Sequence, residues 1–115
     1  MVSRRTDAVI EPPEGSLAEA VRRLVELFQP ERIYLFGSQA RGDTTEDSDY
    51  DLMVIVPAST EPGYRRAQEA YGVLWGVRIP MDVLVWTHDE FEEMVPVVAS
   101  LPASIMREGK LLYAA

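Results

Sequence analysis

The chain of 115 residues contains no cysteine and a single histidine. The missing cysteines exclude disulfide bonds and thiolate metal sites, so oxygen ligands are what remain for a metal ion. No apolar run reaches the length of a membrane span, and none follows the charged N-region of a secretory signal. From these absences we expect a soluble, cytoplasmic protein with no membrane partner.

Positive charge is scarce, with 11 Lys and Arg against 19 Asp and Glu and a formal net charge of −8. Direct binding of nucleic acid is therefore disfavoured on charge alone, because such binding draws most of its affinity from cationic side chains on the phosphate backbone. The length fits one domain and leaves no room for a separate substrate-recognition domain. We expect residues 1–15 to form a loosely ordered lead-in, with a short strand or docking segment at 8–10, and residues 16–115 to form one domain.

Hydrophobic periodicity and helix-capping patterns divide the chain into alternating helices and strands. A capping box of Ser16 and Glu19 starts the first helix, and Pro30 stops it. The further elements we expect are strands at 32–36, 50–56, 80–86 and 109–113, a helix from a Thr60 cap to Gly76, a helix at 88–95 capped by Thr87, and a helical piece at 97–107 interrupted by Pro102. This order predicts an α/β (α+β) fold, a small mixed sheet of about four strands with helices packed mainly on one face.

Carboxylates gather at the start of the second predicted strand. Asp49 and Asp51 are two residues apart, so on a strand they project to the same side. Two charges about 4 Å apart repel by about 1 kcal/mol in water and about 4 kcal/mol at a protein surface, which favours a hard cation such as Mg²⁺ or Mn²⁺ between them. Asp82 lies within another apolar strand and joins them if the two strands are neighbours. Such a triad can hold two metal ions that bridge a triphosphate and an attacking hydroxyl, with Asp82 placed to help deprotonate that hydroxyl.

The turn before this strand carries features of a phosphate site. Gly37 allows a tight turn, and Ser38 can cap a short helix whose free amides favour an anion. Arg41 either contacts phosphate or pairs with an acidic neighbour. Gly42 permits a left-handed exit from the helix, and Ser48 is expected to cap the turn that aims the first aspartate.

The stretch "GSQARGDTTEDSDYDL" resembles the signature of the nucleotidyltransferase superfamily that includes DNA polymerase beta. The small size is similar to that of the minimal nucleotidyltransferases (MNT), commonly the antitoxin half of HEPN/MNT toxin–antitoxin pairs. The resemblance is tight over residues 35–52, with looser support from "MDVLV" and "REGKLLY". At average residue frequencies the specified positions would coincide by chance on the order of once in 10⁸ starts or fewer. These positions are Gly37, Ser38, Arg41, Gly42, Ser48, Asp49 and Asp51.

The resemblance implies a polymerase beta-like core that transfers a nucleoside monophosphate from a nucleoside triphosphate, and in the antitoxin branch AMP from ATP, with Mg²⁺ or Mn²⁺ as cofactor. It implies that Gly37 and Ser38 lie at the phosphates, that Asp49 and Asp51 bind metal, and that Asp82 is the third ligand and the base. In the antitoxin branch it implies that the acceptor is a tyrosine of a HEPN-type toxin, an RNase that is thereby silenced. Two alternatives stay open: an antitoxin that neutralises its toxin by binding alone, and transfer to a small molecule.

Aromatic and charged side chains outside this stretch are expected to be structural. Tyr71 and Trp75 fall on an apolar helical stripe and are predicted to be core, although Trp75 and Tyr64 could edge a partner-binding surface. Arg65 and Arg66 are predicted to lie on an exposed helix face, as are the acidic residues of "EFEE".

Overall fold

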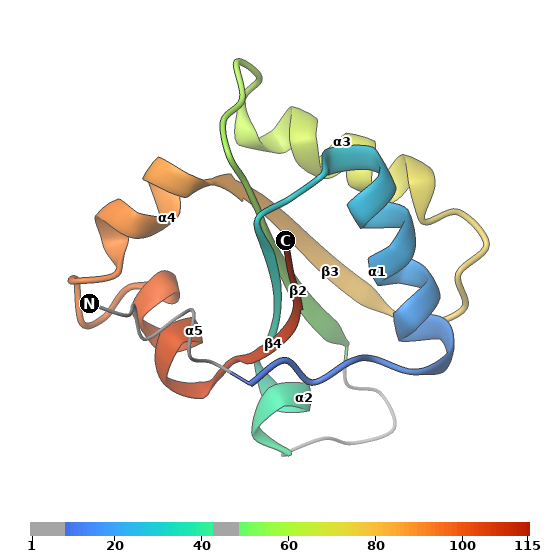
Figure 1. Ribbon diagram of the computed structural model, residues 1–115, viewed down its shortest axis with the longest axis horizontal. Helices are drawn as coiled ribbons and strands as arrows, with labels where there is room; N and C mark the ends of the chain where they lie inside the picture. Colours follow the sequence, from blue (N-terminus) through green and yellow to red (C-terminus); the bar gives the residue numbers. More distant parts are fainter. Residues whose placement is uncertain (1–8, 43–48) are drawn as a thin grey trace.

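The computed structural model describes residues 9–42 and 49–115, which form one mixed sheet and the helices around it (Figure 1). The sheet order is β3-β2-β1-β4, with β1 antiparallel to β2 and β4 and with β2 parallel to β3. In these ranges the elements are α1 (Gly15–Phe28), β1 (Arg32–Phe36), α2 (Ser38–Arg41), β2 (Tyr50–Val56), α3 (Gly63–Val73), β3 (Met81–Thr87), α4 (His88–Met94), α5 (Leu101–Glu108) and β4 (Lys110–Ala114). The predicted fold class, a small mixed sheet of four strands with helices, is confirmed.

Helices cover both faces of this sheet, so the expectation that they pack mainly on one face was wrong. On one face, Leu24 of α1 packs with Val54 in a core that also includes residues of α3. On the other face, Met53 packs with Phe91 of α4 and Ile105 of α5. Figure 1 shows α1 and α3 on one side of the strands and α4 and α5 on the other. The physical reason lies in β2, because a strand that is apolar at consecutive positions must be buried on both sides.

Helix starts differ from the predicted caps at several places. The helix α1 begins after Glu14, and no side chain caps it. The expected box with Ser16 is absent because the helix starts earlier than predicted, which puts Ser16 inside its first turn. The Glu19 carboxylate pairs with Arg22 and Arg23 instead.

Prolines begin two of the helices. Pro62 is the N-cap of α3, so this helix starts later than the Thr60 cap would place it. Pro102 lies in the first turn of α5, where Ser100 caps the helix, so it begins this helix and does not interrupt it. Proline suits this position because its missing N–H would have no helical partner there. The predicted capping box at Thr87 is confirmed.

The end of the lead-in pairs with the last strand. Ile10 forms a parallel bridge to Leu111, and the N–H of Glu11 donates to the Leu111 carbonyl at 2.8 Å. The expected short strand at 8–10 is thus a single bridge at Ile10, while Ala8 lies outside the described residues. In the part of the chain that the structure describes, none of the helices combines the length and apolar character that crossing a bilayer requires.

Arg66 is buried, with 4% of its surface exposed, which corrects the prediction of an exposed face. Its guanidinium donates to the Val85 carbonyl at 2.6 Å and to both carboxylate oxygens of Glu90 at 3.0 and 3.1 Å. It also reaches the Glu61 carbonyl at 3.2 Å. Arg66 therefore ties α3 to the end of β3 and to the start of α4.

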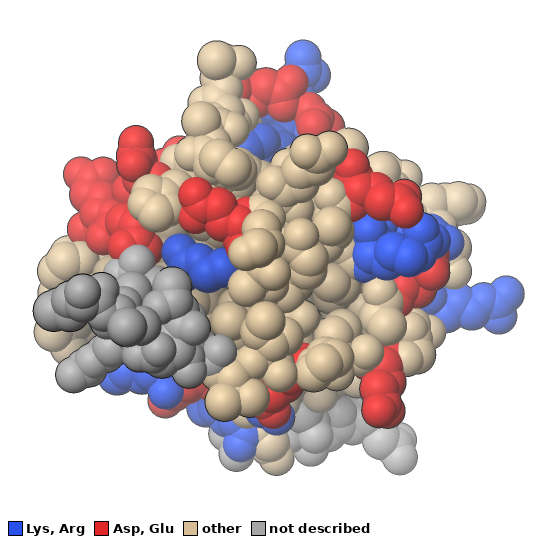
Figure 2. Space-filling view, viewed as in Figure 1, with Lys and Arg blue, Asp and Glu red and all other residues tan. Residues whose placement is uncertain are grey.

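Glu90 has two structural tasks, because one of its carboxylate oxygens also accepts from the Thr87 N–H at 2.8 Å. The hydrogen bond from Arg66 is the main cause that lowers the pKa of Glu90, followed by the bond from the Thr87 backbone. Of the acidic residues of "EFEE", Glu90 and Glu93 are exposed as expected, whereas Glu92 is half-buried. Figure 2 shows acidic side chains gathered over the region of α4.

We predict that Glu90→Gln lowers the free energy of unfolding by about 1 kcal/mol at pH 7, since the substitution removes the charge and keeps an acceptor oxygen. The pKa of Glu90 is lower in the folded state, so its stabilisation is present above its ordinary pKa of 4.5 and is lost as the pH falls through the folded value. Urea denaturation from pH 7 to pH 3 should show the difference from wild type shrinking in acid. Glu93→Gln is the matched control, and an equal loss there would contradict the assignment.

Candidate active site

A glycine begins the turn that follows β1. Gly37 is the N-cap of α2, with φ 73° and ψ −155°, a conformation that is open essentially to glycine alone. Ser38 is the first residue of the helix and not its cap, which corrects that prediction. Gly42 ends the helix in a left-handed conformation at φ 83°, as predicted, and its N–H donates to the Ser38 carbonyl at 2.9 Å.

The lack of a side chain at Gly37 lets this turn lie directly against a carboxylate. A Cβ atom at this position would collide with the Asp51 oxygen Oδ2. The contact follows from the register of the antiparallel pair, in which Phe36 at the end of β1 faces Asp51 at the start of β2. The turn expected at the phosphates and an aspartate expected at the metal are therefore in contact.

Two of the three predicted carboxylates are direct neighbours in the sheet. Asp51 of β2 pairs in register with Asp82 of β3, and because the strands are parallel their Cα atoms are about 4.8 Å apart. The condition on which the triad depended, that these two strands lie side by side, is met. Asp49 lies just before β2 and is exposed. The described chain brings these three side chains to one end of the parallel pair.

The electrostatics of Asp51 reflect this crowding. Burial raises the pKa of Asp51, and the charges of Asp82 and Asp49 raise it further, while Arg41 acts in the opposite direction. The charges of Asp82 and Asp49 therefore make it more costly for Asp51 to be ionised. A cation bound between them would reverse that cost.

Arg41 lies close enough to influence the carboxylates, and its guanidinium is also 3.9 Å from the Glu108 carboxylate of α5. At that distance and with both side chains exposed, the ion pair is weak. Ser48 lies outside the described residues, so its predicted capping role has no structural description here.

Tyr71 is a site residue that sequence reasoning missed. The apolar stripe of α3 predicted a core position, but 46% of Tyr71 is exposed. Its hydroxyl donates to Oδ1 of Asp82 at 3.0 Å and accepts from the N–H of Val83 at 2.9 Å. Periodicity could not reveal this contact, because it locates the helix face and not the position reached by a polar group at the tip of a ring.

Beside Tyr71 a hollow of about 310 Å³ opens between the end of α3 and the start of β3. Its lining is largely apolar, and Met81, next to Asp82, is part of it. Trp75 also lines it and is 87% exposed, which corrects the prediction of a core tryptophan. Tyr71 lines the hollow and hydrogen-bonds to Asp82, so this residue connects the apolar surface to a carboxylate of the site.

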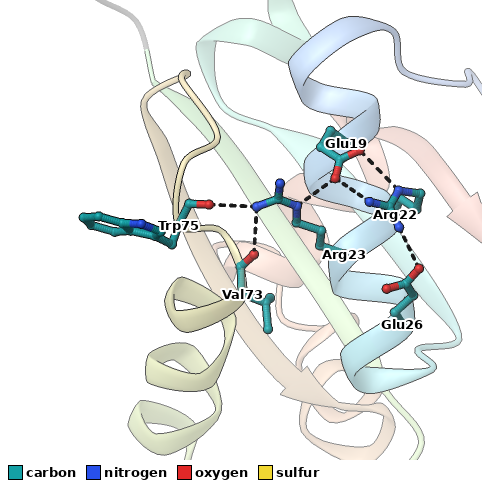
Figure 3. A network of polar contacts seen from close by, with 6 residues as sticks. All are labelled: Glu19, Arg22, Arg23, Glu26, Val73 and Trp75. Carbon is teal, nitrogen blue, oxygen red and sulfur yellow. Dashed lines mark hydrogen bonds and ion pairs between the residues drawn. The ribbon is translucent and has the colours of Figure 1, made fainter.

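An arginine of α1 holds the loop that carries this tryptophan. Figure 3 shows Arg23 between the Glu19 carboxylate and the backbone of the loop. Arg23 donates to the carbonyls of Val73 at 3.2 Å and Trp75 at 2.8 Å, and to Glu19 at 2.7 Å. The exposed indole is thus attached to backbone that is fixed from a neighbouring helix.

The donor chemistry of the site fits a hard divalent cation, because carboxylate oxygens from adjacent positions are the ligands that Mg²⁺ and Mn²⁺ prefer. The mutual repulsion at Asp51 points the same way. Among the described residues, no group of three or more His, Asp or Glu side chains is already arranged as a metal site. The structure offers two neighbouring carboxylates, with the third beside them.

Comparison with known proteins points to one family. A family model described as a nucleotidyltransferase domain matches residues 17–112. A presumed nucleotidyltransferase from Sulfolobus solfataricus superposes with a TM-score of 0.61 at 21% identity, over 86% of this chain and 78% of that one. A crystal structure of a toxin–antitoxin with AMP-PNP gives a TM-score of 0.52 at 21% identity, over 84% and 73%. At this identity the two structures show a shared fold alone, and no curated protein matches the chain.

We predict that Gly37→Ala lowers the free energy of unfolding by about 1–3 kcal/mol, because it forces a side chain into a glycine conformation and against Asp51. It should also weaken Mn²⁺ binding, measured by titration with electron paramagnetic resonance. Gly15→Ala is the control, since Gly15 also has a positive φ, of 59°, but a Cβ there meets open space. Equal effects of the two variants on stability and Mn²⁺ binding would refute the importance of the Gly37 contact.

Proposed function

Because the chain belongs to the nucleotidyltransferase domain family, we propose that it transfers AMP from ATP to a hydroxyl group of a partner protein. The observation that carries this proposal is the contact of the Gly37 turn with Asp51, which has Asp82 as its neighbour in register. The proposed chemistry needs a phosphate-binding turn next to paired carboxylates, and the contact of Gly37 with Asp51 supports the turn after β1 in that role.

The donor nucleotide is assigned to the turn between β1 and β2. Gly37 and Ser38 provide backbone N–H groups for the triphosphate, and Arg41 adds a positive charge near Asp51. Asp49, Asp51 and Asp82 would hold two Mg²⁺ ions, which when bound stabilise the charge on the attacking and departing oxygens. Gly42 would let the chain leave α2 in a left-handed conformation, and Ser48 would cap the turn that aims Asp49.

The acceptor hydroxyl is assigned to the side of Asp82. In the proposed reaction Asp82 accepts the proton, the hydroxyl oxygen forms a bond to the α-phosphorus, and the bond from that phosphorus to pyrophosphate breaks. The products are a phosphodiester on the acceptor and free pyrophosphate. Because Asp82 lies on β3 while the Gly37 turn follows β1, donor and acceptor approach from opposite sides of β2.

A protein acceptor fits the surroundings of Asp82 better than a small polar molecule does. The hollow beside it is largely apolar, and Trp75 is exposed at its edge. Exposed tryptophans are frequent anchors of protein interfaces. Likeness to a chain from a toxin–antitoxin structure supports a toxin as this partner. We propose specifically a tyrosine of an all-helical HEPN-type toxin, which makes the chain an antitoxin.

The first test is to incubate the purified chain with α-labelled ATP and Mg²⁺, with and without a purified all-helical HEPN-type toxin as the candidate acceptor. We expect label on that partner, and a loss of at least about 100-fold in Asp49→Asn and Asp51→Asn, because metal ions supply several kcal/mol of transition-state stabilisation. Asp89→Asn, at an exposed position of α4, is the matched control and should label normally.

The same experiment separates catalysis from simple binding. Size-exclusion chromatography of the mixture reports complex formation independently of labelling. A stable complex without label for any of the four nucleoside triphosphates would overturn the enzymatic proposal and support an antitoxin that acts by occupying its toxin.

The role of the hollow is tested with Trp75→Ala. We expect the KM for the protein acceptor to rise at least about 10-fold with the KM for ATP unchanged, because only the acceptor side is altered. Val98→Ala is the control, since Val98 is 78% exposed and follows α4, away from the hollow. A rise in the KM for ATP alone would place the nucleotide, and not the partner, in the hollow.

A further inference from the structure

We propose that Tyr71 is a positioning residue that fixes the orientation of the Asp82 carboxylate. This inference rests on the proposed function, since it gives Asp82 a task in binding a cation and an acceptor. Tyr71 matches no position of the signature around Gly37 and comes from a helix, whereas the carboxylates lie on or next to strands.

The Tyr71 hydroxyl uses its single proton and one lone pair in defined directions. The proton goes to Oδ1 of Asp82 at 3.0 Å, and a lone pair accepts the N–H of Val83 at 2.9 Å. The Val83 amide belongs to the strand that carries Asp82. The hydroxyl is therefore held by the backbone of β3 while it orients a side chain of the same strand. Rotation of the carboxylate would break the bond to Oδ1 while the bond to Val83 holds the hydroxyl in place.

The position of β3 in the sheet explains why this hydroxyl is available. Within the described residues β3 is an edge strand, paired on one side with β2. The outward N–H of Val83 would otherwise face solvent, and Tyr71 reaches around the edge from α3 to accept it. One side chain thereby satisfies the strand edge and restrains the adjacent carboxylate.

When Tyr71 holds Oδ1, the other carboxylate oxygen of Asp82 is left to contact a cation or the acceptor hydroxyl. Asp51 adjoins Asp82 across the sheet, and Tyr71, which holds Oδ1, also lines the apolar hollow. A carboxylate with one oxygen held by a neutral donor presents the other to a cation or a hydroxyl without first losing rotational freedom. Residues that hold metal ligands in this way are typically worth about 10- to 100-fold in metal affinity or activity.

The test compares wild type with Tyr71→Phe, which removes the hydroxyl and keeps the ring. Titration of Mn²⁺ alone, followed by electron paramagnetic resonance, should show a dissociation constant raised about 10-fold or more. The matched control is Tyr64→Phe, on the same helix and 69% exposed, which should bind Mn²⁺ as wild type does. Thermal unfolding of each variant establishes that the folded protein is being titrated.

A double-mutant cycle separates positioning from a general loss of structure. If Tyr71 acts through Asp82, Tyr71→Phe should have no further effect on Mn²⁺ affinity in an Asp82→Ala background, which lacks the acceptor oxygen. A merely structural role would weaken binding equally in both backgrounds, and that result would overturn the inference.

The outcomes also distinguish this inference from the proposed function. Wild type that labels its partner, with Tyr71→Phe unchanged in Mn²⁺ affinity, overturns the positioning role and leaves nucleotidyl transfer standing. Wild type that binds Mn²⁺ in a Tyr71-dependent manner but labels nothing supports the positioning role and counts against transfer. Wild type that neither binds Mn²⁺ nor labels its partner overturns both.

Discussion

The structure depends on the burial of β2 from both sides. Leu52 to Val56 are all buried, so the strand needs helices on each face and a strand at each edge. Its polar end can lie only where that cover stops, which is at Asp51. The same constraint brings the turn after β1 and the start of β3 to this end of the sheet. The candidate site is therefore the place where a fully covered strand emerges.

Sequence reasoning located the strands and the carboxylates because both are local signals. An apolar run between turns marks a strand, and a spacing of two residues puts Asp49 and Asp51 on one side. The sequence indicated that the triad requires the strand of Asp82 to lie beside β2, but it did not determine whether these two strands are neighbours. Contacts between distant elements produce no pattern in the local sequence. For this reason Tyr71, which contacts Asp82, was predicted to be core, and the buried Arg66 was predicted to be exposed.

The capping box expected at Ser16 shows a different limit. The motif was present, but α1 starts at Gly15, so Ser16 lies within the helix. Glu19 pairs with two arginines of its own helix instead, and Arg23 in turn holds the backbone around Trp75. A local pattern competes with every other partner that the fold supplies. Here the ion pair of Glu19 with Arg23 stabilises the contact between α1 and the end of α3. Glu19 therefore supports a tertiary contact and does not cap its own helix.

The parallel pairing of β2 with β3 also determines when the site can exist. Asp49 and Asp51 leave the ribosome well before Asp82, and parallel strands need a complete crossover, here through α3, before they pair. Contacts of such long sequence separation form slowly compared with local ones. A nascent chain that ends before β3 lacks the carboxylate neighbour of Asp51, so the two carboxylates come together only once β3 has been synthesised and has paired with β2.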